Sequence, residues 1–469
     1  ALARKPTLAR KKGRAAALFI EDAAGWVLSR VRARAPRRSR GPRVAGSGAA
    51  ARLAMAVLLV SAAASPAAAQ IVADGQRFHP VLAPDGMVVS REARASAVGR
   101  DVLRAGGNAI DAAVAVGFAL AVTLPRAGNL GGGGFMMVHM AEEGETIAID
   151  YRETAPAAAT RDMFLDAAGD ADPAKSRFSG LAVGVPGTVA GLARAHALYG
   201  SGRFTLAELI RPAVALARDG IAVTRPLHDG LASDWVRPRL SADPAAAAVV
   251  AAAGRHLEVG ALLRQPDLAD TLEAIAREGP DGFYRGAVAT AIAETVRERG
   301  GVMTRADLAA YAPIVREPVR GRFMGYEIVS MPPPSSGGVH LVQMLNILSR
   351  FPLAEWGHGS ARTIHAIAEA ARRAYADRSR YLGDPDFVDV PVASLLDPAY
   401  AERLAEAIDP RRATASSAVA PGLDLPGEST ETTHFSVVDA DGNAVANTYT
   451  LNFSYGVGFL ATGTGVLLN

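Results

Sequence analysis

The sequence contains no cysteine, which excludes disulfide bonds, thiolate metal sites and a cysteine nucleophile. Its nine histidines form no H-E-x-x-H pair, and it has no Gly-Lys-Ser/Thr phosphate loop and no G-x-S-x-G nucleophile elbow. These absences argue against a zinc protease, a P-loop nucleotidase and a serine α/β-hydrolase. No segment repeats at a fixed period, so the chain does not have the sequence signature of a repeat protein.

The charge of the chain is unevenly distributed. The total is +3, from 50 Lys+Arg against 47 Asp+Glu. Residues 1–52 hold 14 basic and two acidic residues, a net +12, so the remainder carries 36 basic and 45 acidic residues, a net −9. The body therefore does not have the charge of a polyanion binder. We expect residues 1–54 to be upstream sequence outside the natural product; a basic arm that binds nucleic acid or membrane is the alternative.

The apolar run 54–64 is 11 residues long, too short to span a bilayer. Arg52 precedes it, and the small residues of 67–69 follow it. This is the pattern of a signal peptide, over residues 55–69 with cleavage after Ala69; a short buried helix is the alternative. We therefore expect a periplasmic or secreted protein with no nucleic-acid partner and no stable membrane span.

Apolar spacing and capping residues predict several helices in the body of the chain. Asn108 is placed to cap the second of them, whose apolar residues lie on all sides, so we expect that helix to be buried. Thr205 and Glu208 form a capping box at the start of another. His365 and Glu369 lie four residues apart on the last one, where we expect a solvated face. The predicted ranges are 90–105, 109–124, 205–220, 268–277, 286–299, 305–311 and 361–381.

Three loops are also predicted. The glycines of 131–134 precede the strand-like segment 135–139, whereas phosphate-binding glycine loops follow a strand and open a helix. A tight turn with close backbone approach is the better interpretation. The segment 332–338 (PPPSSGG) is predicted to be a rigid loop, and 411–426 an exposed linker.

The last part of the chain predicts a β-hairpin, with strands over 433–439 and 443–452 and a turn between them. A pair of threonines opens this hairpin directly after the linker. A threonine hydroxyl becomes a useful nucleophile when a base lies beside it, and cleavage of the chain before the threonine would make its own α-amine that base. Threonine is also common in strands for reasons of packing alone.

The body of the sequence, through nearly all of 80–469, resembles the γ-glutamyltransferases, a family of N-terminal-nucleophile hydrolases. The motifs that carry this resemblance include GMVVSREARASAVGRDVLRAGGNAIDAAVAV (86–116), LPRAGNLGGGGFM (124–136), AIDYRETAPAAATRDMF (148–164), AVGVPGTVAGL (182–192), MPPPSSGGVHLVQMLNIL (331–348) and the segment 432–468. The resemblance implies an α/β fold, an αββα sandwich. It also implies a large chain over 70–431 and a small chain that begins at Thr432.

The resemblance assigns the candidate site. Thr432 matches the family's nucleophile, so the precursor would cut itself between Glu431 and Thr432. Thr450 matches the threonine that supports the nucleophile, Arg152 the arginine that holds the substrate α-carboxylate, and Asn452 the asparagine that contacts the glutamyl α-amino acid group. No metal and no organic cofactor is implied. The implied partners are glutathione or other γ-glutamyl compounds, with water, an amino acid or a dipeptide as acceptor, and the two chains would form a heterodimer.

The sequence departs from the family pattern at its end. The family's later acidic residue, Ser-Ser pair and Gly-Gly element have no counterpart before Asn469. This predicts an incomplete sheet and an inactive, poorly folded 469-residue chain, whereas the complete gene product would be active. A related acylase, such as a cephalosporin acylase or a polyglutamate-processing enzyme, and a non-catalytic relative are the alternatives. Arg152 favours a substrate with a free α-carboxylate, hence a γ-glutamyl compound.

Overall fold

The computed structural model describes residues 81–252, 255–419 and 432–469. The predictions for the basic segment 1–54, for the signal peptide 55–69 and for Glu431 lie outside these residues. Among the described helices, none combines the length and the hydropathy that a bilayer crossing needs.

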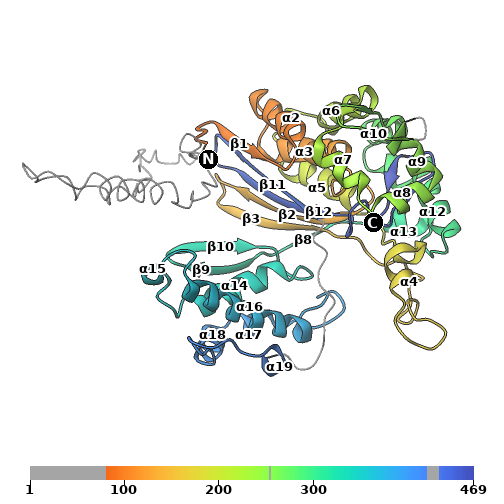
Figure 1. The fold of residues 1–469 in the computed structure, drawn as a ribbon. Helices are drawn as coiled ribbons and strands as arrows, with labels where there is room; N and C mark the ends of the chain where they lie inside the picture. The colour runs from red at the N-terminus through yellow and green to blue at the C-terminus, as the bar shows by residue number, and fades with distance from the viewer. Residues whose placement is uncertain (1–80, 253–254, 420–431) are drawn as a thin grey trace, which may run out of the picture. The chain divides into compact units, whose positions relative to one another are not determined.

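A six-stranded antiparallel sheet forms the centre of the described fold (Figure 1). The predicted hairpin is confirmed, and its two strands occupy the second and third places in the sheet rather than an edge. The strands follow the order β1 (Gly86–Val89), β11 (Thr432–Asp439), β12 (Ala444–Thr450), β2 (Gly133–Met140), β3 (Glu145–Tyr151) and β8 (Ile314–Arg316). The other sheets in the described ranges have two strands each, so the second large sheet of the predicted sandwich is not among these residues.

Helix α3 (Ala109–Thr123) packs against the sheet and is buried along its whole length, as its apolar sequence predicts. Asn108 caps it in a capping box with Asp111, which satisfies backbone donors at the buried helix start. The Tyr449 hydroxyl donates to the Gly117 carbonyl at 2.9 Å and so ties β12 to the middle of this helix. Helices α2 (Ala93–Arg104) and α5 (Thr188–Tyr199) pack against α3.

A second group of helices lies outside α3. Helix α6 (Leu206–Asp219) contacts α3 and α10 (Pro266–Glu278), and it begins with the predicted capping box of Thr205 and Glu208. The first and last residues predicted from the sequence for the helices of this group agree with the observed ones to within two residues. The other elements here are α4 (Pro173–Phe178), η1 (Gly180–Ala182), β4 (Ile221–Ala222), α7 (Arg225–Ala232), α8 (Arg237–Ala242), α9 (Pro244–Val250), β5 (Ala251–Ala252), β6 (Arg255–His256), β7 (Leu262–Leu263), α11 (Asp281–Tyr284), α12 (Gly286–Glu298), α13 (Arg305–Ala310), β13 (Leu460–Ala461) and β14 (Val466–Leu467).

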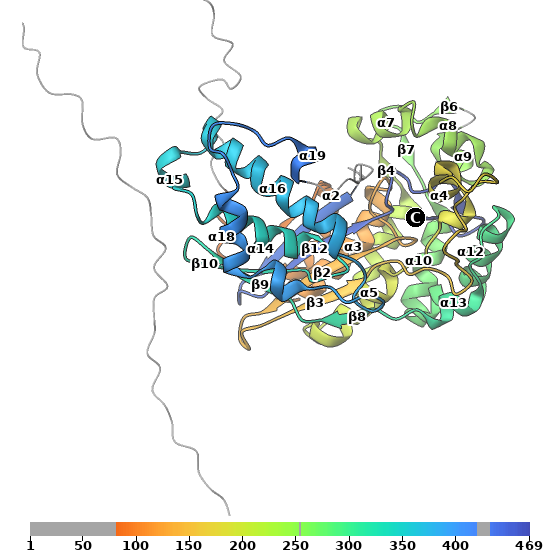
Figure 2. The same cartoon turned by 90° about the horizontal axis from the view of Figure 1, so that it is seen from below.

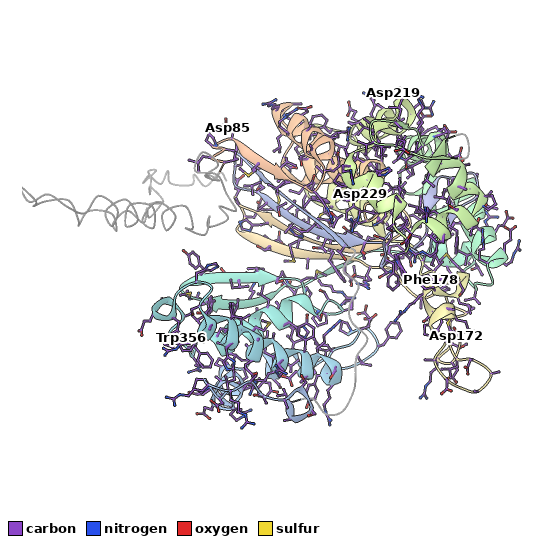
Figure 3. The ribbon with its side chains drawn as sticks, viewed as in Figure 1. Asp85, Asp172, Phe178, Asp219, Asp229 and Trp356 are labelled. Carbon is purple, nitrogen blue, oxygen red and sulfur yellow. The ribbon has the colours of Figure 1, made fainter. Side chains whose placement is uncertain are left out.

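The segment from 319 to 419 lies on the other side of the six-stranded sheet from α2 and α3, and the view from below shows α14 and α16 in front of the sheet (Figures 1 and 2). In Figure 3, the labelled Asp219 lies on the side of the sheet that α2 and α3 cover, and the labelled Trp356 lies on the other side. The short helix α19 interrupts the predicted linker 411–426. The elements are β9 (Val319–Phe323), β10 (Tyr326–Ser330), α14 (Gly337–Leu348), α15 (Leu353–Trp356), α16 (Ala361–Tyr381), α17 (Val392–Leu395), α18 (Pro398–Glu406) and α19 (Ser416–Val419).

The prediction of a solvated face around His365 and Glu369 is wrong. The Glu369 side chain is 1% exposed and accepts from Arg373 Nη1 at 2.7 Å and from the Thr414 hydroxyl at 2.6 Å. Burial alone would raise the pKa of this carboxyl, but the hydrogen bonds from Thr414 and Arg373 lower it to about 2. Glu369 thus forms a buried ion pair with Arg373 one turn along the helix, and Thr414, 45 residues further along the chain, adds a hydrogen bond to it.

The close backbone approach predicted for the glycine run 131–134 is confirmed, but the tight turn is not, since Gly133 and Gly134 already belong to strand β2. A Cβ atom on Gly131 would collide with the Leu467 carbonyl oxygen, and one on Gly132 would collide with that of Thr450. The run leads into β2, which pairs with β12. These glycines thus let the backbones of β2, β12 and β14 approach at the end of β12 where Thr450 lies.

Candidate active site

Thr432 and Thr450 lie opposite each other at one end of the β11–β12 hairpin. The antiparallel register pairs them directly, and their Oγ1 atoms are 3.5 Å apart. Thr432 is exposed, whereas Thr450 is 8% exposed. The structure therefore places a buried hydroxyl beside an accessible one, the arrangement expected of a nucleophile and its supporting group.

Asn452 follows β12 in a left-handed backbone conformation, with φ of 68°. Asparagine tolerates this conformation better than most residues. Its backbone N–H donates to Thr450 Oγ1 at 2.9 Å, so the turn orients the supporting hydroxyl. Its side-chain amide donates from Nδ2 to Glu153 Oε1 at 3.4 Å.

Arg152 immediately follows β3, and its backbone N–H donates to Asp150 Oδ1 at 3.0 Å. Its guanidinium donates from Nη2 to Asn452 Oδ1 at 3.4 Å, and its side chain is 47% exposed. Residues 300 positions apart in the sequence are thus brought together. The guanidinium lies over the Phe135 ring, 5.8 Å from the centroid, and an exposed planar guanidinium of this kind suits bidentate binding of a carboxylate.

These four residues line one cavity of about 560 Å³, a volume in the range of small-ligand sites. The strand ends of the large sheet form one wall. The opposite wall comes from the loop before α14 and from the end of α16 with the loop that follows it. The lining residues are Phe135, Asp150, Arg152, Glu153, Thr154, Tyr311, Ala312, Ile314, Arg316, Pro334, Ser335, Ser336, Arg378, Asp384, Asp386, Thr432, Thr450 and Asn452.

Glu153 is a site residue that our sequence analysis missed. Its side chain is only 6% exposed, and its Oε2 lies 3.7 Å from Arg152 Nε. Burial raises the pKa of this carboxyl, and the neighbouring Arg152 charge opposes the rise. The signal was present in the sequence, since Glu153 directly follows the arginine that the resemblance assigns to substrate binding.

Arg316 is a second missed residue. It donates from Nε to Asp150 Oδ2 at 2.8 Å and from Nη1 and Nη2 to the two oxygens of Asp386 at 3.1 and 2.6 Å. It therefore joins the strand that precedes Arg152 to the loop after α16. The hydrogen bonds with Asp386, followed by those with Asp150, raise the pKa of Arg316 despite its burial. No sequence pattern connects these three residues.

Within the described ranges, no group of three or more His, Asp or Glu side chains is arranged to hold a metal ion. Glu431, on the other side of the predicted cleavage bond, lies outside those ranges. The structure therefore brings Thr432, Thr450, Arg152 and Asn452 together, while their chemical roles stay predictions.

The chain matches proteins of one family. A family model described as Gamma-glutamyltranspeptidase matches residues 95–469. The chain is 51% identical over 424 residues to the glutathione hydrolase proenzyme of Escherichia coli K12, covering 89% of this chain and 72% of that protein. It is 41% identical over 396 residues to the acylase ACY 1 proenzyme of Pseudomonas sp. SE83, covering 83% of this chain and 69% of that one.

Solved structures agree with this assignment. The Helicobacter pylori gamma-glutamyltranspeptidase superposes with a TM-score of 0.70 at 44% identity, covering 74% of this chain and 97% of that one. A cephalosporin acylase from Bacillus halodurans superposes with a TM-score of 0.73 at 29% identity, covering 84% and 70%. The predicted α/β N-terminal-nucleophile hydrolase fold is thereby confirmed, and the chain belongs to the gamma-glutamyltranspeptidase family.

Proposed function

We propose that the chain is a γ-glutamyltransferase and glutathione hydrolase precursor that cuts itself before Thr432 and then uses Thr432 as its nucleophile. One observation carries the proposal. The Thr432 hydroxyl lies 3.5 Å from that of Thr450, in a cavity that also holds Arg152 and Asn452. The relatives named glutathione hydrolase proenzyme support the substrate and the self-processing.

The first half-reaction forms an ester on Thr432. Cleavage of the bond after Glu431 frees the Thr432 α-amine, whose reference pKa of about 7.7–8.0 suits proton transfer near neutral pH. The Thr432 oxygen attacks the γ-amide carbon of glutathione while this amine takes the hydroxyl proton. The amine then gives the proton to the departing nitrogen, and a γ-glutamyl ester remains. Thr450 supports the nucleophile from 3.5 Å away.

Substrate recognition uses the charged groups around the threonine pair. Arg152 binds the glutamyl α-carboxylate through its planar guanidinium. Asn452 contacts the α-amino acid group, and Glu153, which the Asn452 amide bonds at 3.4 Å, places a carboxyl beside it. These polar groups favour a γ-glutamyl donor over the substrates of related acylases, because a site built to hydrogen-bond a substrate discriminates against ligands that leave its polar groups unpaired.

The second half-reaction resolves the ester. Water releases glutamate, whereas the amine of an amino acid or dipeptide gives a new γ-glutamyl peptide. The chemistry uses the residues of the chain, with no organic cofactor and no metal.

The two chains remain together after the cut. The cleavage point lies at the start of β11, and β11 and β12 are flanked in the sheet by β1 and β2 of the large chain. Both outer ladders, β1 with β11 and β12 with β2, join the small chain to the large one. Separation would break both ladders, so a heterodimer of residues 70–431 and the part that begins at Thr432 is the expected product.

The location of the protein follows from its leading segment. We infer export to the periplasm or outside the cell, with the signal peptide removed after Ala69. Sequencing the amino terminus of the large chain from the native host tests this, and a start upstream of residue 55 would contradict it.

Self-cleavage is the most direct test of the nucleophile. We expect the complete wild-type gene product to give two bands on a denaturing gel, with Thr432 at the new amino terminus by mass spectrometry. Thr432→Ala should give one band and release no anilide from a γ-glutamyl anilide, whereas Thr432→Ser should still cleave. Thr433→Val is the matched control, because the buried Thr433 hydroxyl has no hydrogen-bond partner in the described part of the chain. Cleavage in Thr432→Ala would sink the proposal.

The acylase alternative is separated by the substrate. Thr432 would serve either activity, but only a γ-glutamyl donor needs Arg152. We expect the anilide of γ-linked glutamate to react and an otherwise equal anilide without the α-carboxylate to react far more slowly. Equal rates would favour an acylase.

A further inference from the structure

The wall of the cavity opposite Thr432 has no role in the chemistry described above. Pro334, Ser335 and Ser336 come from the loop before α14, Arg378 from the last turn of α16, and Asp384 from the loop that follows it. This wall is polar and carries a cation of its own. The elements that supply it lie on the other side of the large sheet from α2 and α3 (Figures 1 and 2).

The cavity contains three arginines in different surroundings. Arg152 belongs to the sheet wall, where it lies 3.4 Å from Asn452. Arg316 is only 13% exposed, so it belongs to the frame of the cavity and is not accessible to a ligand in the way a more exposed side chain is. Arg378, from the last turn of α16, also lines the cavity and is partly exposed, with its guanidinium carbon 5.8 Å from the centroid of the Tyr375 ring.

The positive charge of Arg378 acts on its surroundings. His340 lies on α14, and its pKa is lowered to about 4, first by burial and second by the Arg378 charge. The imidazole is therefore neutral near neutral pH and adds no second cation to this wall. Arg378 supplies the positive charge at this side of the cavity, and Asp384 and Asp386 are the carboxylates that line it there.

A γ-glutamyl peptide has a carboxylate at each end, with the scissile amide between them. Arg152 beside the threonine pair suits the glutamyl α-carboxylate. We propose that Arg378 binds the second carboxylate, the carboxyl terminus of the peptide that leaves and of the amino acid or dipeptide that accepts. This inference rests on the proposed function, since it names the part of the same substrate that lies beyond the scissile bond.

The same subsite serves both half-reactions. The leaving peptide and the acceptor each have an amine that must reach the Thr432 ester carbon and a carboxylate that points away from it. A cation on the opposite wall orients both molecules in this direction. It thereby lowers the entropy cost of aligning the amine with the ester carbon. Acceptors with a free carboxylate should therefore be preferred to their amides.

The test compares two substrates in four proteins. The substrates are γ-glutamylglycine and its carboxyl-terminal amide, and the measurement is kcat/KM for glutamate release. The proteins are the self-processed complete gene product as the wild type and its variants Arg378→Gln, Arg378→Lys and Arg380→Gln. Arg380 is the matched control because it lies on the same helix, is exposed and is not among the residues that line the cavity.

We expect the wild type to prefer the acid over the amide by about tenfold, the ratio that one charge-assisted hydrogen bond supplies. The ratio should fall to about unity in Arg378→Gln. It should stay at an intermediate value in Arg378→Lys, which keeps the charge but loses the planar fork. Arg380→Gln should keep the wild-type ratio. The wild-type preference should also fall with rising salt, a measurement that needs no variant.

The outcomes separate the inference from the function on which it rests. If the wild type releases glutamate from neither peptide nor from a γ-glutamyl anilide, the proposed function itself is wrong. If the wild type hydrolyses both peptides equally well, the function stands and the Arg378 subsite is refuted. A full acid preference in Arg378→Gln would also refute it. Because each ratio compares two substrates in one protein, a partly unfolded variant does not alter it.

Discussion

The bridge from Arg316 to Asp150 and Asp386 allows a quantitative prediction. Arg316→Met keeps the length of the side chain and removes its three charge-assisted hydrogen bonds. The Asp150 side chain is 7% exposed, and in this variant it would keep the hydrogen bond from the Arg152 N–H at 3.0 Å. Breaking a buried ion pair costs about 3–5 kcal/mol. The remaining N–H places the expected loss near the lower limit, about 3 kcal/mol of unfolding free energy.

Asp386 is a different case because its side chain is 45% exposed. An ion pair of this kind contributes about 1 kcal/mol or less, so Asp386→Asn should cost far less than Arg316→Met. Arg320→Met is the matched control. Arg320 pairs with Glu327 at 2.9 Å, with both side chains about half exposed, and the loss should again be about 1 kcal/mol or less.

Guanidinium unfolding followed by far-UV circular dichroism measures these differences, from the shift in midpoint multiplied by the mean slope. The double variant Arg316→Met/Asp386→Asn should show a coupling of about 1 kcal/mol or less between the two sites. An Asp386→Asn loss as large as that of Arg316→Met would refute the view that the buried Asp150 dominates. An equally large loss in Arg320→Met would do the same.

Two further predictions concern the site itself. Gly132→Ala should abolish self-cleavage, since its Cβ atom would displace the Thr450 carbonyl; a denaturing gel shows this, and Gly230→Ala, whose Cβ has 3.4 Å to its nearest neighbour, should still cleave. Glu153→Gln should become more stable relative to the wild type as pH rises above about 4.5. Burial raises the pKa of Glu153 in the folded state, so the unfolded state loses the Glu153 proton at a lower pH than the folded state does. The unfolding free energy of the wild type therefore falls as pH rises through this range, whereas the Glu153→Gln variant has no proton to lose at this position. Unfolding midpoints across pH measure this, and a difference that is constant with pH would contradict it.

The local features of the fold were predictable from the sequence. The hairpin turn at 439–442 fixes the register that brings Thr432 opposite Thr450, and Asn108 and Thr205 mark the starts of α3 and α6. These features depend on residues a few positions apart, so short-range physical rules identify them.

The far wall of the cavity was not predictable in this way. Asp386, which lines the cavity, bonds Arg316 from 70 residues away. Outside the cavity, Thr414 likewise bonds the buried Glu369 from 45 residues away. Such pairs arise when separate elements pack, and neither partner has a local pattern that identifies the other. The role of Arg152 was assigned only through the family resemblance, since a single arginine after a strand is equally consistent with a surface ion pair.

The alternation of burial along β11 has a consequence for protein engineering. Thr433, Phe435 and Val437 are buried, and the Phe435 ring packs edge-to-face on Tyr449 with centroids 6.0 Å apart. The intervening residues His434 and Ser436 face the other side and are partly or fully exposed. A substitution library confined to these two alternate positions would vary the surface next to the nucleophile without disturbing the packing that supports it. One strand thus separates positions that can be varied from those on which the fold depends.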